Sequence, residues 1–444
     1  MRCLQREIER AIEVNREVAG LACHVADWLP SHLTPATLQG LQHSLRADLF
    51  AVDQRLSNFR WRRSRRAQVL GRRFAGTPYF RECRNAHVAM LEERDRQYRW
   101  RRDLIRQVGD TVAWLVLRRD PAIISALFAK RSHHSPDLVG LMGPHMLSDQ
   151  AHAAGMVLVI DNDLTRCLGT GDITVVSNDD LWARPIVLEI KTRLDDHGEI
   201  EISAFGPSSG DESDTRLFDL FRQATIGDDS PPYDVSVNHP KQTSDMQTHI
   251  RLLFELTRGS VESLRGPSSV QWQSLENVLS KALQTGSSFD IVDGVVYLAV
   301  RSRASDQAAP WLIALRDRLI DFGIDAPQYE SHTIVEFEQH DFVSAIIPPI
   351  ALWRLSHAVR AALLSGELFF ATLNKPNAWV EAFAKNGITL VDEKRGWTLQ
   401  RGTADLFIRR RDVVRLRLAL AFIGMSPARL ADNVARLLGD VSTP

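Results

Sequence analysis

Residues 156–192 read MVLVIDNDLTRCLGTGDITVVSNDDLWARPIVLEIKT, and this stretch decides the kind of fold that we expect. The runs DITVV and PIVLEIKT are rich in β-branched residues and flank a polar segment, which predicts two strands joined by a turn. Side chains alternate between the two faces of a strand. The apolar residues of the second run therefore form a core-facing side, and Glu189 and Lys191 lie together on the other side.

These two ionisable residues have a simple explanation and a functional one. An exposed edge strand with a solvated face would explain Glu189 and Lys191 without any function, whereas burial would require a charge partner or a metal. A second acid, Asp172, begins the preceding strand, 17 residues before Glu189. Because neighbouring strands lie about 4.8 Å apart, the three groups can meet at one end of a sheet. Two carboxylates suit Mg²⁺ or Mn²⁺, and a nearby lysine can stabilise charge on a phosphate.

This arrangement, Gly171-Asp172 followed by Glu189-x-Lys191, resembles the PD-(D/E)XK nuclease superfamily, which has the restriction-endonuclease-like fold. Gly171 stands where the motif has proline, a variation that the superfamily tolerates. The resemblance implies that Asp172, Glu189 and the backbone carbonyl of Ile190 hold Mg²⁺ or Mn²⁺, and that Lys191 is the catalytic lysine. It covers the middle third of the chain.

The function implied is hydrolysis of phosphodiester bonds by in-line attack of a metal-activated water. We expect a metal-dependent nuclease with DNA as the favoured substrate, acting in bacterial restriction or anti-phage defence. The alternative is a non-catalytic protein that uses a nuclease-like core to hold nucleic acid or a partner.

A further acid is expected from the helix that precedes the first strand. Residues 103–117 have apolar side chains on two faces, which predicts a helix covered on both sides, with Asp110 on the second face. Folds of the PD-(D/E)XK type usually open with a helix that often donates another acid, so Asp110 is the candidate. A local ion pair, for example with Arg106, explains Asp110 equally well.

Composition bounds the class of protein. The chain has 444 residues, of which 44% are hydrophobic and 25% are charged, typical of a soluble globular protein with two or three domains. The charged, helix-like start does not resemble a signal peptide, and no apolar run is long enough to span a membrane. The four cysteines are scattered, which argues against a disulfide framework or a structural zinc site and favours the cytoplasm.

Arginine is concentrated near the amino terminus. Residues 55–102 contain 15 Arg, no Lys and 4 acidic residues, a net charge of +11 in a chain whose total is −1. Arginine favours bidentate phosphate contacts, and the interleaved aromatic residues can stack on bases, so the segment predicts a surface for nucleic acid. The predicted contacts are Arg62, Arg63, Arg65, Arg66, Arg72 and Arg73. Alternatively, the arginines lie over a core and pair with acids elsewhere.

The order of elements predicts an α/β fold with a restriction-endonuclease-like core, a mixed β-sheet between helices. The expected core elements are a helix at 103–117, strands at 156–160, 172–176 and 185–192, a helix at 244–257 and a strand at 295–300. Three domains follow: a helical, Arg-rich region at 1–102, the nuclease-like core at 103–303, and an α+β region at 304–444. The core contains an acidic loop insertion at 206–240 with one short helix around residues 217–221. The last region has no catalytic pattern, and its alternative roles are recognition of nucleic acid, dimerisation and binding of a partner protein.

Overall fold

The structure is a computed structural model, which we take in two units, residues 1–259 and 260–444. The chain has a mixed α/β fold. The structure describes residues 2–73, 78–118, 123–124, 127–128, 138–168, 171–178, 185–194, 200–205, 212–225, 234–236, 269–292, 295–301, 330–333, 349–374, 378–402, 404–409, 431 and 435.

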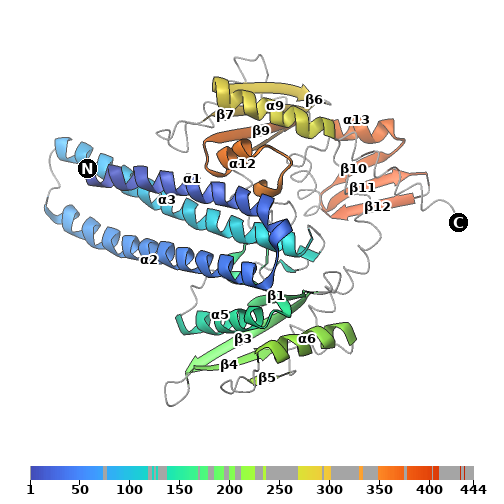
Figure 1. Cartoon of the computed structure of the whole chain (residues 1–444). Coiled ribbons are helices and arrows are strands. Elements are labelled where there is room, and N and C mark those ends of the chain that lie inside the picture. The colour runs from blue at the N-terminus through green and yellow to red at the C-terminus, as the bar shows by residue number, and fades with distance from the viewer. Residues whose placement is uncertain are drawn as a thin grey trace. The chain divides into compact units, whose positions relative to one another are not determined.

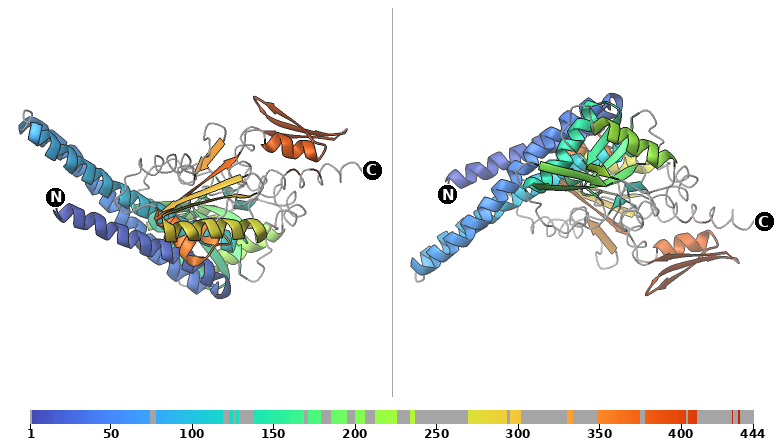
Figure 2. Two further views of the ribbon diagram at one scale, coloured as in Figure 1. Left: turned by 90° about the horizontal axis from the view of Figure 1, so that it is seen from above. Right: turned by 90° about the horizontal axis from the view of Figure 1, so that it is seen from below.

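Three long helices open the first unit (Figure 1): α1 (Arg2–His32), α2 (Pro35–Arg73) and α3 (Pro78–Val116). The Thr34 hydroxyl accepts the backbone N–H of Thr37 at 3.1 Å, and Pro35 stands at the first helical position, so the sequence Thr-Pro starts α2. Helices α2 and α3 have 39 residues each and are drawn in the lighter blues of Figure 2, so the described part of the Arg-rich segment is helical as predicted.

A five-stranded sheet follows the helices, in the order β1-β2-β3-β4-β5. Neighbouring strands are antiparallel from β1 to β4, and β5 lies parallel to β4. The first three strands confirm the strands predicted from the sequence. The bounds are β1 (Val157–Asp161), β2 (Ile173–Ser177), β3 (Ile186–Leu194), β4 (Ile200–Phe205) and β5 (Asp234–Ser236).

Two helices supply one side of the core of this sheet: α5 (Leu138–Ala153), before β1, and α6 (Glu212–Thr225), between β4 and β5. The apolar residues of one sheet face, including Ile186, Leu188 and Ile190, form a buried cluster with side chains of α5 and α6. The alternation expected for β3 is therefore confirmed, because this apolar face is the core face.

Side chains cover the outer edge of the first strand. The amide of Gln42 on α2 donates to the carbonyl of Val159 at 2.8 Å and accepts the N–H of Asp161 at 2.7 Å. Nε2 of His152 accepts the N–H of Val159 at 3.0 Å. These bonds satisfy backbone groups that an edge strand would otherwise leave open to pairing with another chain.

The short helix expected around residues 217–221, within the insertion at 206–240, is confirmed as part of α6, which buries Leu217, Phe218 and Phe221 against the sheet. One expectation for the core is corrected. The strand expected at 295–300 exists, but it belongs to another sheet in the second unit and does not complete this one. The helix expected at 244–257 lies outside the described residues.

The second unit contains a four-stranded antiparallel sheet in the order β6-β7-β9-β8. Trp272 on α9 and Trp353 lie with ring centroids 6.0 Å apart, and Phe370 on β9 completes this aromatic cluster. The elements are α9 (Ser269–Thr285), β6 (Ser287–Val292), β7 (Val295–Arg301), β8 (Glu330–Thr333), η4 (Ile350–Leu352), α12 (His357–Leu364) and β9 (Leu368–Asn374).

The remaining elements are a helix and a three-stranded antiparallel sheet, with Trp397 fully buried against Trp379 and Phe383. The elements are α13 (Ala378–Lys385), β10 (Thr389–Glu393), β11 (Gly396–Arg401) and β12 (Ala404–Arg409).

The three expected regions stay a prediction. Helix α3 is continuous across residues 102 and 103, and the two units of the structure are residues 1–259 and 260–444. In the described part of the chain, no helix is both long and apolar enough to cross a membrane.

Candidate functional site

The two acidic residues of the motif lie on neighbouring strands. Ile173 of β2 is paired with Leu188 of β3, so Asp172 stands at the end of this ladder, beside the segment that contains Glu189. Asp172 and Glu189 are both half-buried, and Lys191, two residues farther along β3, is exposed. The sequence therefore predicted correctly that these two strands would be adjacent.

The backbone before Asp172 requires glycine. Gly171 has φ of 64°, in the left-handed region, and a Cβ atom there would lie 2.3 Å from Val187 Cγ1 and 2.8 Å from the carbonyl oxygen of Leu188. The N–H of Asp172 donates to that same carbonyl at 2.9 Å, and the carbonyl of Asp172 accepts the N–H of Asn162 at 3.0 Å. The residue that replaces the motif proline is thus explained by the close approach of β3.

The carboxylate of Asp172 is held against the peptide bond between Glu189 and Ile190. Its Oδ2 atom accepts the N–H of Ile190 at 2.6 Å. The N–H and carbonyl of a strand residue point to the same side, so the carbonyl of Ile190 also faces the edge where β2 ends. The groups that the resemblance assigns to a metal, two carboxylates and this carbonyl, therefore belong to one small region at the end of a strand pair.

This donor set suits a hard cation by its chemistry, because Mg²⁺ and Mn²⁺ prefer oxygen ligands. Among the described residues, no three or more His, Cys, Asp or Glu side chains gather as a metal site. The predicted set contains only two carboxylates, with a backbone carbonyl as its third ligand. The oxygen donors present therefore fit Mg²⁺ or Mn²⁺, and the metal site stays a prediction.

Asp110 has a different set of partners from those expected. It is fully buried, and its Oδ1 accepts the backbone N–H groups of Arg166 at 2.6 Å and Cys167 at 2.9 Å. Its Oδ2 accepts Nε of Arg166 at 3.0 Å. Asp110 therefore forms an ion pair with Arg166. These three bonds tie α3 to the segment after β1 and account for Asp110 without a metal.

Burial also affects the neighbouring thiol. Desolvation, followed by the negative charge of Asp110, raises the pKa of Cys167 well above its ordinary value. A thiol in this environment stays protonated and unreactive at neutral pH. Cys167 is therefore a packing residue of this segment.

Sequence reasoning missed a buried ion-pair cluster beside β1. Nε of Arg46 donates to Oδ2 of Asp161 at 2.5 Å, and its NH1 group lies 2.9 Å from Oδ1 of Asp149. Burial, and then the nearby charge of Arg46, lowers the pKa of His152 to about 4. These residues come from α2, α5 and β1, more than 100 positions apart in the case of Arg46, so no local pattern could have revealed the cluster.

The six predicted nucleic-acid contacts lie on α2, but their side chains are outside the described residues. The side chains of other arginines in the segment are described, and one of them lies over an aromatic residue and near an acid, as the alternative reading expects. Arg94 stacks on Phe59, with its guanidinium carbon 3.4 Å from the ring centroid, and it lies 3.8 Å from a carboxylate oxygen of Glu7. The nucleic-acid surface stays a prediction.

Comparison with known proteins found no matching family model, no matching curated protein and no matching solved structure.

Proposed function

We propose that the chain is a metal-dependent nuclease of the PD-(D/E)XK type, with DNA as its favoured substrate, acting in bacterial restriction or anti-phage defence. One observation carries the proposal: the carboxylate of Asp172 accepts the N–H of Ile190, which brings it beside Glu189 at the end of β2. The antiparallel strands β1, β2 and β3 are compatible with the three-stranded meander expected of a restriction-endonuclease-like core, and the opening helix expected at 103–117 lies at the end of α3.

Each residue of the proposed site has a distinct task. Asp172, Glu189 and the carbonyl of Ile190 would hold the ion. When bound, Mg²⁺ or Mn²⁺ supplies Lewis acidity toward the phosphate and promotes ionisation of water. Lys191 is exposed on β3, where its ammonium group can approach a phosphate and stabilise the negative charge that develops during hydrolysis. The hydrogen bond from Ile190 keeps the carboxylate of Asp172 in place.

The experiment is incubation of plasmid DNA, and separately of RNA, with the full chain in Mg²⁺, Mn²⁺ or EDTA. We expect cleavage that requires the metal and is lost in Lys191→Ala, with unchanged folding because Lys191 is exposed. Lys281→Ala, which removes an exposed lysine from α9 in the second unit, is the control and should cleave normally. Cleavage that persists in EDTA or in Lys191→Ala contradicts the mechanism.

The Arg-rich segment is proposed to hold the substrate through its phosphates. Replacing four arginines together should weaken DNA binding and lower the salt slope by up to about 0.9 for each phosphate contact that is lost. If the arginines instead pack over a core, the melting temperature falls while the salt slope does not change. The four residues to replace are Arg62, Arg63, Arg65 and Arg66.

A second candidate function is non-catalytic binding of nucleic acid or a partner. The observation that favours it is again the bond from Ile190 to Asp172, because a carboxylate that completes the hydrogen bonding of β3 has a structural reason to be there. Binding of DNA or RNA without cleavage in any metal would favour this candidate.

A further inference from the structure

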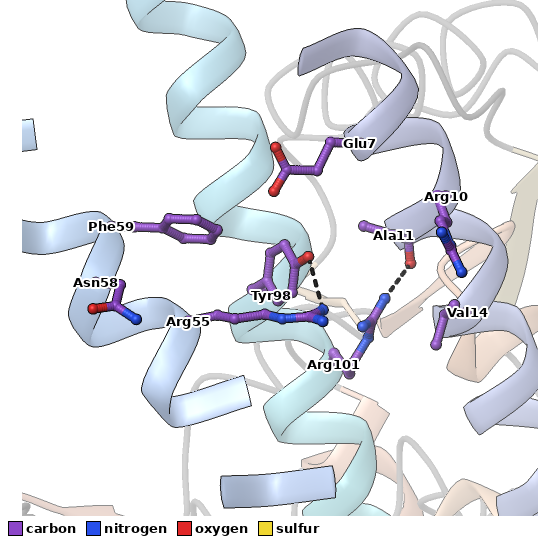
Figure 3. A pocket seen from close by; sticks show the side chains of 9 residues that line it. All are labelled: Glu7, Arg10, Ala11, Val14, Arg55, Asn58, Phe59, Tyr98 and Arg101. Atoms are coloured by element: carbon purple, nitrogen blue, oxygen red, sulfur yellow. Dashed lines mark hydrogen bonds between the residues drawn. The ribbon is translucent and has the colours of Figure 1, made fainter. Parts of the chain in front are cut away.

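A pocket of about 620 Å³ lies among the three long helices of the first unit (Figure 3). Side chains from α1, α2 and α3 line it, among them Arg10, Arg55 and Arg101, with Tyr98 and Phe59 as its aromatic members. Its size is within the range of pockets that hold small molecules. Nothing in the motif of β2 and β3 involves these residues, so the pocket needs its own explanation.

The pocket has an excess of positive charge. Glu7 is the only acid among its lining residues, and it already faces Arg94, whose NH1 group lies 3.8 Å from its Oε2 atom. Within the part of the chain that the structure describes, no carboxylate comes within ion-pair distance of Arg10, Arg55 or Arg101. Three guanidinium groups thus border one cavity without a direct counter-charge.

Arg101 is the most informative of the three because it is buried, with 9% of its surface exposed. Its Nε donates to the amide oxygen of Asn15 and its NH2 group to the carbonyl of Ala11, both at 3.1 Å. Both acceptors are neutral. A buried guanidinium held only by neutral groups is costly, and a bound anion would offset that cost. Burial lowers the pKa of Arg101 and the like charge of Arg55 acts in the same direction, whereas the charges of Tyr98, Asp48 and Glu17 act in the opposite one.

Tyr98 connects the two inner arginines. The guanidinium carbons of Arg55 and Arg101 lie 5.5 Å and 5.1 Å from the centroid of its ring. NH1 of Arg55 donates to the Tyr98 hydroxyl at 3.1 Å (Figure 3), so this oxygen acts as acceptor and its own proton can be donated to a ligand. Two guanidinium groups therefore lie near the ring of Tyr98, beside its hydroxyl group.

We propose that this pocket binds a phosphate-bearing ligand through Arg55, Arg101 and the hydroxyl of Tyr98. Phosphate is the anion that fits best, because its several oxygens and its multiple charge match two planar guanidinium groups and a hydroxyl donor. The volume leaves room for a nucleoside attached to the phosphate. Either a free nucleotide or the phosphorylated end of a nucleic acid strand has this chemistry, and the proposal is independent of the metal site.

The test is calorimetric titration of the full chain with pyrophosphate and with ATP, in EDTA at about 150 mM salt. EDTA removes divalent ions, so binding at the proposed metal site does not contribute. We expect saturable binding of one molecule per chain. Arg55→Gln should weaken it about tenfold or more, since a charge-assisted hydrogen bond and an exposed, replaceable cation are lost. Tyr98→Phe should weaken it less, while the ring remains in place.

Arg99→Gln is the matched control, because Arg99 is an exposed arginine next to Tyr98 on α3 and does not line the pocket. It should bind like the wild type. The proposal is overturned if neither probe binds, if Arg55→Gln binds as tightly as the wild type, or if Arg99→Gln weakens binding equally.

Competition with a short 5′-phosphorylated oligonucleotide then separates the two sources of the phosphate. Displacement of pyrophosphate supports a nucleic acid end, and failure to displace it supports a free nucleotide.

Discussion

Replacing Asp110 with asparagine distinguishes a structural carboxylate from a catalytic one. The substitution keeps the shape of the side chain and one acceptor oxygen for the backbone N–H groups, but it turns an amide N–H₂ toward Nε of Arg166, which is itself a donor. Asp110 is fully buried and the side chain of Arg166 is 10% exposed, so the substitution removes from the interior the negative charge that lies 3.0 Å from Nε of Arg166. Breaking such a buried pair costs about 3–5 kcal/mol.

For a domain of this size, about 1 kcal/mol shifts the melting temperature by about 2–4 °C, so at the lower end of that cost the first unit should melt about 6–12 °C earlier. Asp103→Asn is the control, because Asp103 lies on the same helix with 45% of its side chain exposed, 3.7 Å from Arg102, and surface pairs contribute little. Melting followed by circular dichroism, together with amide exchange at Arg166 and Cys167, measures the effect. A variant that melts like the wild type but no longer cleaves DNA would refute the structural reasoning.

Three further predictions concern the first unit. His152 accepts the N–H of Val159 only when its ring is neutral, and burial lowers its pKa from 6.5 to about 4. The resulting stability is present above about pH 6.5 and is lost as pH falls toward 4. In His152→Gln, the urea concentration at the unfolding midpoint should therefore depend less on pH between about 6.5 and 4 than in the wild type. Gly171→Ala should cost about 1–3 kcal/mol by thermal melting, since φ is positive and β3 is too close. Gln42→Leu should cost about 1–3 kcal/mol for each edge group left without a partner, with faster amide exchange in β1.

The parts of the fold that depend on local pattern could be predicted from the sequence. Alternation along β3 separates the apolar residues of the core from Glu189 and Lys191, and a turn between two β-type runs makes the neighbouring strand the natural partner. The helical nature of α1, α2 and α3 follows from their composition and spacing in the same way. Each of these predictions involves residues close together in the chain.

The predictions that were wrong concern which elements pack together. Residues 206–240 have the composition of a loop, rich in Gly, Ser, Pro and Asp, and the short helix expected around residues 217–221 did not indicate that Leu217, Phe218 and Phe221 pack in the core of the sheet. The strand at 295–300 was correctly located but assigned to the wrong sheet, because its partners come from distant segments. Asp110 is 56 residues from Arg166, so its partner depends on tertiary packing.

Binding of Mn²⁺ to the full chain, followed by electron paramagnetic resonance, tests the central claim most directly. We predict that the wild type binds the ion, that Asp172→Asn and Glu189→Gln each weaken binding by at least about tenfold, and that Lys191→Ala keeps the ion while losing DNA cleavage. The separation of binding from cleavage follows from the tasks assigned to the carboxylates and the lysine. Unchanged Mn²⁺ binding in both carboxylate variants would contradict the proposed metal site.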